Sequence, residues 1–156
     1  MTEAIGHPSL TDLVRMPRFL PLVKPWSMPK ILLVDDDPLY VRAFVRFANS
    51  SDVPVAAITS LQAFEALENW DFDVAVIDYD LRSATGLEFA AALEQKIGAM
   101  PMLLISNSDQ HQTRDADWPA SIGWFVNKEK GFRSIIDTAA SLYEATPRRR
   151  RRSVVR

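Results

Sequence analysis

Aspartates directly follow two short apolar segments of this sequence. Asp35 and Asp36 come after Ile31–Val34, and Asp78 comes after Val74–Ile77. A short, continuous apolar run rich in β-branched residues is typical of a strand buried in a parallel sheet. The carboxyl ends of such strands lie along one edge of the sheet, where open α/β folds bind their ligands. We therefore expect the carboxylates of Asp35, Asp36 and Asp78 to lie close together.

Three neighbouring carboxylates repel one another, and this repulsion raises their pKa values as a coupled set. A hard divalent cation relieves the repulsion. Mg²⁺ fits such a site because it takes oxygen ligands, keeps several waters and accepts a phosphate oxygen. These side chains therefore predict a magnesium site that serves phosphoryl transfer.

Two further strand ends carry groups that bind phosphate. Ser106 follows the apolar segment Met102–Ile105, and Lys128 comes two residues after Trp124–Val126. The lysine offers a compact positive charge and the serine a hydroxyl donor. Asp78 would then be the nucleophile that forms an aspartyl phosphate, since positioning and charge neutralisation are most of what phosphoryl transfer requires. Each residue taken singly is an ordinary turn, capping or loop residue, so the prediction depends on their combination.

The elements that must position these residues alternate between strand-like and helix-like segments. The expected strands are Ile31–Val34, Val53–Ile58, Val74–Ile77, Met102–Ile105 and Trp124–Val126. The expected helices are Leu39–Ala48, a segment from Leu61 to Leu67 capped by Thr59 or Ser60, Gly86–Lys96 and Phe132–Tyr143. This alternation predicts a parallel sheet with helices on both faces and right-handed crossovers.

The apolar residues of two expected helices allow further predictions. In the first helix we expect the apolar face to consist of Leu39, Val41, Phe44, Val45 and Ala48. A fourth helix is expected over residues 108–117, yet Ala116 is the only apolar residue there. Because a helix that is polar on all sides is marginally stable, we expect this one to be short or irregular, with Trp118 and Ile122 anchoring its far end.

The segment from about Pro29 to Thr146 resembles the receiver domain of bacterial two-component response regulators. The matching motifs are Ile31-Leu-Leu-Val-Asp-Asp-Asp-Pro, Val76-Ile-Asp-Tyr-Asp-Leu with Gly86 eight residues after Asp78, Leu104-Ile-Ser106, and Phe125-Val-Asn-Lys128. Their order and spacing agree with the family. The resemblance implies a flavodoxin-like, doubly wound sheet of five parallel strands in the order 2-1-3-4-5.

The resemblance also implies a role for each candidate residue. Asp78 would accept a phosphoryl group from a histidine kinase or a phosphotransfer protein. The implied ligands of Mg²⁺ are Asp35, Asp36, Asp78 and the backbone carbonyl of Asp80. Ser106 and Lys128 would contact the phosphoryl group. Phe125 stands at the position of a switch aromatic that turns inward on phosphorylation, although it could equally be an ordinary half-buried strand residue.

Three residues depart from the family pattern. Glu129 and Arg82 stand where proline is usual or common, and Asn107 replaces a small residue beside the site. We expect a looser loop after Lys128 and restricted access of water beside Asn107. A stand-alone receiver domain would act on an unidentified downstream protein by contact, and it could form a dimer. The sequence therefore predicts the chemistry and leaves the output open.

Two other functions remain as alternatives. The Asp78-Tyr79-Asp80 pattern is shared with haloacid-dehalogenase-like phosphatases, but that family places the pattern on its leading strand and has a hydroxyl residue where Arg82 stands. The other alternative is an interaction module of the same fold that signals by docking, without phosphorylation. An irregular fourth helix makes this second alternative plausible.

Composition sets the remaining expectations. The apolar share of 47% and charged share of 24% are those of a soluble globular domain, and the absence of cysteine excludes disulfides and thiolate metal sites. We expect an irregular extension over residues 1–28, the receiver domain over 29–146 and an Arg-rich tail over 147–156. Translation could equally begin at Met28. No segment approaches the length of a membrane span, so the cytoplasm is the expected location.

Charge is distributed unevenly along the chain. Residues 29–146 contain nine basic and 18 acidic residues, whereas residues 147–156 contain six arginines and no acid. The run Arg148–Arg152 could attract nucleic acid or an anionic membrane without specificity. It lacks the interleaved aromatic residues of a stacking platform. We therefore expect no specific nucleic-acid partner and favour a solvated tail that folds back on the acidic domain.

Overall fold

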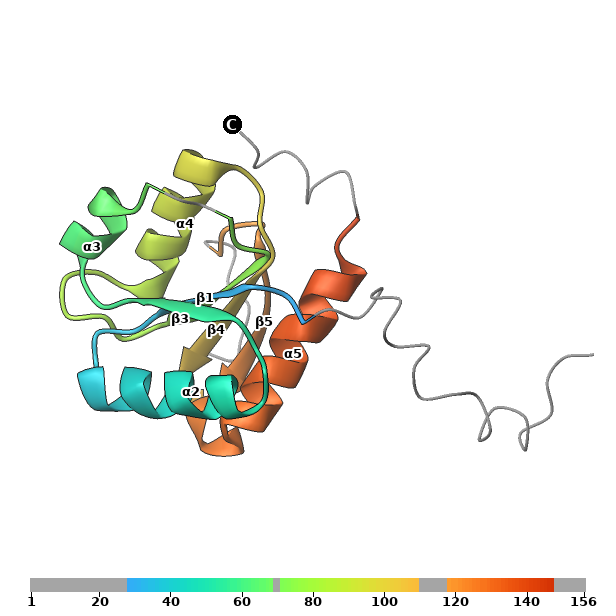
Figure 1. The fold of residues 1–156 in the computed structure, drawn as a ribbon. Coiled ribbons are helices and arrows are strands. Elements are labelled where there is room, and N and C mark those ends of the chain that lie inside the picture. Colours follow the sequence, from blue (N-terminus) through green and yellow to red (C-terminus); the bar gives the residue numbers. More distant parts are fainter. Residues whose placement is uncertain (1–27, 69–70, 110–117, 148–156) are drawn as a thin grey trace, which may run out of the picture.

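Five strands form one parallel sheet in the computed structural model, which describes residues 28–68, 71–109 and 118–147 (Figure 1). The sheet order is β2-β1-β3-β4-β5. The strands are β1 (Ile31–Val34), β2 (Val55–Ile58), β3 (Val74–Asp78), β4 (Met102–Ser106) and β5 (Ile122–Asn127). This order confirms the predicted flavodoxin-like α/β fold.

Helices cover both faces of the sheet (Figure 1). The helical elements are α2 (Pro38–Ser50), α3 (Leu61–Ala66), α4 (Gly86–Ile97), the 3₁₀ turn η3 (Lys128–Lys130) and α5 (Phe132–Ala145). The apolar residues of α2 and α5 share one core with the sheet, and those of α3 and α4 share the other. The sheet is therefore the middle of three layers.

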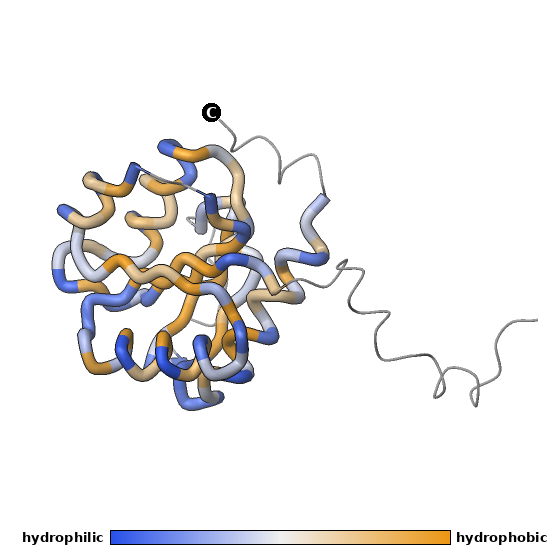
Figure 2. Tube along the Cα trace, in the orientation of Figure 1, coloured by the Kyte–Doolittle hydropathy of each residue, from blue (hydrophilic) through white to orange (hydrophobic). Residues whose placement is uncertain are grey.

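Successive residues of a strand enter opposite cores. In β1, Ile31 and Leu33 pack with α2 and α5, whereas Leu32 and Val34 pack with α3 and α4. Because both faces are covered, the whole strand is apolar. Figure 2 shows hydrophobic residues concentrated along the central strands. Polar residues begin where the strands end, so the sheet is a rigid platform for the groups at its carboxyl edge.

Local signals place the helices that flank this edge. The side chain of Asp37 caps α2 by accepting hydrogen bonds from the N–H groups of Leu39 and Tyr40. Thr85 and Glu88 form a capping box at the start of α4. A Cβ atom on Gly86 would collide with the backbone carbonyl oxygen of Asp78. Glycine therefore allows α4 to begin directly against the end of β3.

Two predicted details are wrong. Strand β5 begins at Ile122, two residues before the predicted start at Trp124; Ile122 is fully buried and pairs with Met102. Leu39 is 73% exposed. The inward stripe of α2 instead passes through Tyr40, Phe44 and Ala48, which are four residues apart and therefore lie on one side of the helix.

Several expectations concern residues that the structure does not describe. These are residues 110–117 of the irregular helix expected over 108–117, the N-terminal extension apart from Met28, and the Arg-rich tail from residue 148 onward. Among the helices of the described ranges, none has the length and apolar character needed to cross a membrane.

Candidate functional site

Three carboxylates meet at the carboxyl edge of the sheet, as predicted. One oxygen from each of Asp35, Asp36 and Asp78 lies within 4.8 Å of the other two. Asp35 and Asp78 come side by side because β1 and β3 are neighbours and pair Val34 with Ile77 just before the two acids. Asp35 is fully buried, Asp78 is almost so, and Asp36 is partly open to solvent.

The ammonium group of Lys128 lies among these acids. Its Nζ is 2.7 Å from Asp35 Oδ2 and 3.3 Å from Asp78 Oδ1. The lysine follows β5, which is separated from β3 by β4, so its long side chain spans that distance. Its side chain is only 7% exposed. One buried cation therefore offsets part of the charge of three acids.

Ser106 ends β4, between the strands that carry Asp78 and Lys128. The residue is fully buried. Its hydroxyl donates to Asp80 Oδ2 at 3.1 Å and accepts a hydrogen bond from the N–H of Ser108 at 3.1 Å. In this structure the hydroxyl is therefore bound to Asp80, a partner that the sequence did not predict.

Backbone N–H groups orient the acids. Asp35 Oδ1 accepts a hydrogen bond from the N–H of Asp37 at 2.9 Å, and Asp36 Oδ2 accepts one from the N–H of Arg82 at 2.6 Å. A proline at position 82 could not donate this second bond. The departure of Arg82 from the family pattern thus adds a donor to Asp36, with the Arg82 Nε 3.9 Å from the same oxygen.

Burial is the main electrostatic effect on Asp78. It raises the pKa of this carboxyl to about 6; Lys128 acts in the opposite direction, Asp35 adds to the increase, and the Asp80 N–H lowers it. The predicted repulsion between acids is thus present, but it is smaller than desolvation. At neutral pH Asp78 is mostly ionised and is held in a low-dielectric pocket.

The donor set fits a hard divalent cation. It consists of oxygens only, it converges from β1 and β3, and Lys128 leaves it with excess negative charge. Mg²⁺ is bound in this way, through a few carboxylates together with water and phosphate oxygens. Asp35, Asp36 and Asp78 are therefore the residues that would hold it.

Residues 31–140 match the family model of the response regulator receiver domain. The chain belongs to this family. It is 30% identical over 81 residues to the transcriptional regulatory protein BasR of Escherichia coli, and this match covers 51% of the chain but 36% of BasR. It is 29% identical over 100 residues to the transcription factor prr1 of Schizosaccharomyces pombe, covering 63% of the chain and 19% of prr1. The matched part is thus a minor part of each relative.

Solved structures share the fold. A Francisella response regulator receiver domain superposes with a TM-score of 0.64 at 19% identity, covering 76% of this chain and 99% of that one. The Thermotoga maritima response regulator TrrA, solved with Mg²⁺ and BeF, superposes with a TM-score of 0.62 at 19% identity, covering 74% and 99%. TrrA has also been solved in complex with the histidine kinase ThkA.

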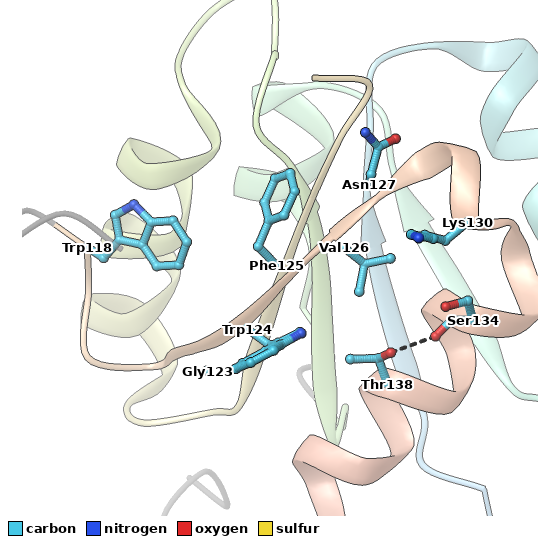
Figure 3. Close-up of a pocket in the computed structure, with 9 residues that line it drawn as sticks. All are labelled: Trp118, Gly123, Trp124, Phe125, Val126, Asn127, Lys130, Ser134 and Thr138. Carbon is cyan, nitrogen blue, oxygen red and sulfur yellow. Dashed lines mark hydrogen bonds between the residues drawn. The ribbon is translucent and has the colours of Figure 1, made fainter. Parts of the chain in front are cut away.

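A separate cavity of about 600 Å³ lies beside β5 and α5 (Figure 3). Phe125 and Asn127 line it from β5, and Ser134 and Thr138 line it from α5. Phe125 is half-buried and packs against the core on the α3 and α4 side. Its predicted role as a switch aromatic stays a prediction.

Sequence reasoning missed one residue of the site. The ring of Tyr40, in the first turn of α2, lies 4.1 Å from Lys128 Nζ. The available signal was its spacing of four from Phe44, which places both rings on one helix face.

Proposed function

We propose that this receiver domain accepts a phosphoryl group on Asp78, with Mg²⁺, from a histidine kinase or a phosphotransfer protein. The observation that carries the proposal is the position of the Lys128 ammonium, within 3.3 Å of both Asp35 and Asp78 in a pocket of three carboxylates. Structural ion pairs rarely include such an excess of acid, because the uncompensated charge is costly to bury.

In the proposed reaction an Asp78 oxygen attacks phosphorus, and the bond from phosphorus to the donor's imidazole nitrogen breaks. The nitrogen keeps the electron pair. Lys128 would contact a phosphoryl oxygen and hold it in line, and Asp35, Asp36, Asp78 and the Asp80 carbonyl would hold the metal. Mg²⁺, when bound, supplies positive charge to the phosphoryl oxygens and the carboxylates.

Ser106 would couple phosphorylation of Asp78 to a conformational change in the rest of the domain. Its hydroxyl has a single proton to donate, and Asp80 accepts it in this structure. A phosphoryl oxygen on Asp78 would compete with Asp80 for that proton. Movement of Ser106 would open space beside β4, into which Phe125 would turn.

The output would be a protein contact. BasR and prr1 are named as transcriptional regulators, and each is much longer than the part that matches. We propose that this chain passes its signal to a separate protein or a second copy, from the cytoplasm, as a receiver domain over residues 29–146.

The test is incubation with Mg²⁺ and acetyl phosphate, followed by intact mass. We expect the wild type to gain the mass of one phosphoryl group and Asp78→Ala to gain none. Asp137→Ala, which removes an exposed acid on α5, is the matched control and should behave as wild type. An unmodified wild type would overturn the proposal in favour of docking without phosphorylation. Release of many phosphates per protein would instead indicate a phosphatase.

A further inference from the structure

The Tyr40 ring is a close neighbour of the Lys128 ammonium. The distance of 4.1 Å from Nζ to the ring centroid is well inside the range of a cation–π interaction. Lys128 has little contact with water because 7% of its side chain is exposed. Cation–π attraction is strongest for such a desolvated cation. The ring is therefore a substantial partner of Lys128, besides Asp35 and Asp78.

The ring is held in place by other aromatic residues. Tyr40 packs edge-on against Phe132 at 5.5 Å between centroids and lies 6.2 Å from Phe44. Phe132 begins α5, four residues after Lys128, and also packs edge-on against Phe44. The same cluster thus fixes the ring on α2 and the start of the helix that follows Lys128.

The hydroxyl group of Tyr40 does not explain why a tyrosine occupies this position. Its oxygen is buried and has no hydrogen-bond partner in the described part of the chain. Burial and the charges of Asp35 and Asp78 raise the pKa of this phenol, so it remains neutral. Burying an unsatisfied hydroxyl is unfavourable. The useful part of the side chain is therefore its ring.

We propose that Tyr40 is a positioning residue that holds the Lys128 ammonium over the acidic pocket. A lysine side chain has a flexible four-carbon stem, and its carboxylate partners are the groups expected to bind a metal. An aromatic face holds the ammonium without neutralising it, so the full charge remains for a phosphoryl oxygen. The position of Lys128 can be tested by itself; its consequence for phosphorylation rests on the proposed function.

The first experiment measures the position of Lys128 by NMR. Protons above an aromatic face are shifted upfield by its ring current. In the wild type the ε-methylene protons of Lys128 should be upfield of those of Lys130, which is exposed. Tyr40→Phe should keep this shift and Tyr40→Leu should abolish it. The matched control is Phe47→Leu, which also removes a ring packed on Phe132, at 5.7 Å, and should leave the shift unchanged.

The second experiment measures the initial rate of phosphorylation by acetyl phosphate and Mg²⁺. Tyr40→Leu should be slower than wild type by about thirtyfold, the size of a desolvated cation–π interaction, and Tyr40→Phe should restore the rate. In a Lys128→Ala background, Tyr40→Leu should cause no further loss, because the two residues act as one unit.

The outcomes separate this inference from the proposed function. Two results would overturn the role of Tyr40. One is a wild-type spectrum in which the ε-methylene protons of Lys128 are not upfield of those of Lys130. The other is an equal loss of phosphorylation rate from Tyr40→Leu with and without Lys128. If the wild type is never phosphorylated, the proposed function fails, and the NMR result still decides the position of Lys128. If Tyr40→Leu does not fold, the wild-type spectrum and Tyr40→Phe decide the question.

Discussion

Asp78 is buried in a pocket that disfavours its charge, and this has a measurable consequence for stability. Its pKa of about 6 in the folded protein lies above the ordinary value of 3.8. The folded state therefore binds a proton more readily than the unfolded state between these values, and stability decreases as pH rises from about 4 to about 6. We therefore expect the ionised carboxylate to destabilise the metal-free fold at neutral pH, by up to about 3 kcal/mol.

Asp78→Asn should therefore be more stable than the wild type at pH 7.5 without Mg²⁺, by up to about 3 kcal/mol. Asparagine keeps an oxygen that Lys128 can approach while the excess negative charge is removed. The difference should disappear near pH 4, where Asp78 is protonated. Urea unfolding at both pH values measures it, and an advantage that is the same at both would contradict the assigned cause.

Lys128 stabilises the fold, whereas the ionised Asp78 carboxylate destabilises it. Lys128→Ala leaves the fully buried Asp35 without its cationic partner, and breaking a buried pair in this way costs about 3 kcal/mol. We expect this loss in urea unfolding at pH 7.5 without Mg²⁺. Lys130→Ala removes an exposed lysine from the same turn and should change stability by less than about 0.5 kcal/mol. Equal effects of the two substitutions would show that the pair does not stabilise the fold.

At the level of elements, the junction of β3 and α4 controls the position of Asp78. Gly86 lies against the backbone at Asp78 and Tyr79, and backbone atoms cannot give way to a new methyl group. At Gly123 the nearest atom to an added Cβ is Leu142 Cδ2 at 2.8 Å, the end of a flexible side chain. The two glycines therefore differ in what surrounds them.

Gly86→Ala should destabilise the domain by about 1–3 kcal/mol, typical of overpacking, and should slow phosphorylation because β3 and α4 must separate beside Asp78. Gly123→Ala should have a smaller effect on stability and none on phosphorylation. Thermal unfolding and the acetyl phosphate assay measure both properties. A Gly123→Ala variant as impaired as Gly86→Ala would argue against a special role of the β3–α4 junction.

For the whole molecule, the metal would join groups from two strands that are far apart in the sequence. A ligand that binds only the folded state stabilises it according to its concentration and affinity. Mg²⁺ at 10 mM should therefore raise the melting temperature at pH 7.5 more than NaCl of the same ionic strength. Asp35→Asn should lose this increase.

Asp71→Asn provides the control for that measurement. Asp71 is an exposed acid that precedes β3, at the other end of the strand from Asp78, and it pairs with Lys30. This substitution removes one negative charge from the same domain without touching the pocket, so the response to Mg²⁺ should persist. If both variants lose the response equally, Mg²⁺ acts by general screening.

Much of the fold and site follows from the sequence alone. Continuous apolar runs, each followed by a polar residue, predicted the strands, and alternation with helices predicted a parallel sheet. In such a sheet the carboxyl ends must lie together, so Asp35, Asp36, Asp78, Ser106 and Lys128 were expected at one edge. This reasoning succeeds because hydrophobic periodicity is a local property of the chain, and strands that alternate with helices pair in parallel.

Tertiary structure decided which groups touch. The Ser106 bond to Asp80, the Arg82 N–H on Asp36 and the Tyr40 ring on Lys128 each join different elements. Local periodicity cannot choose these partners, because side-chain direction and burial are set only when helices and strands pack around a shared core.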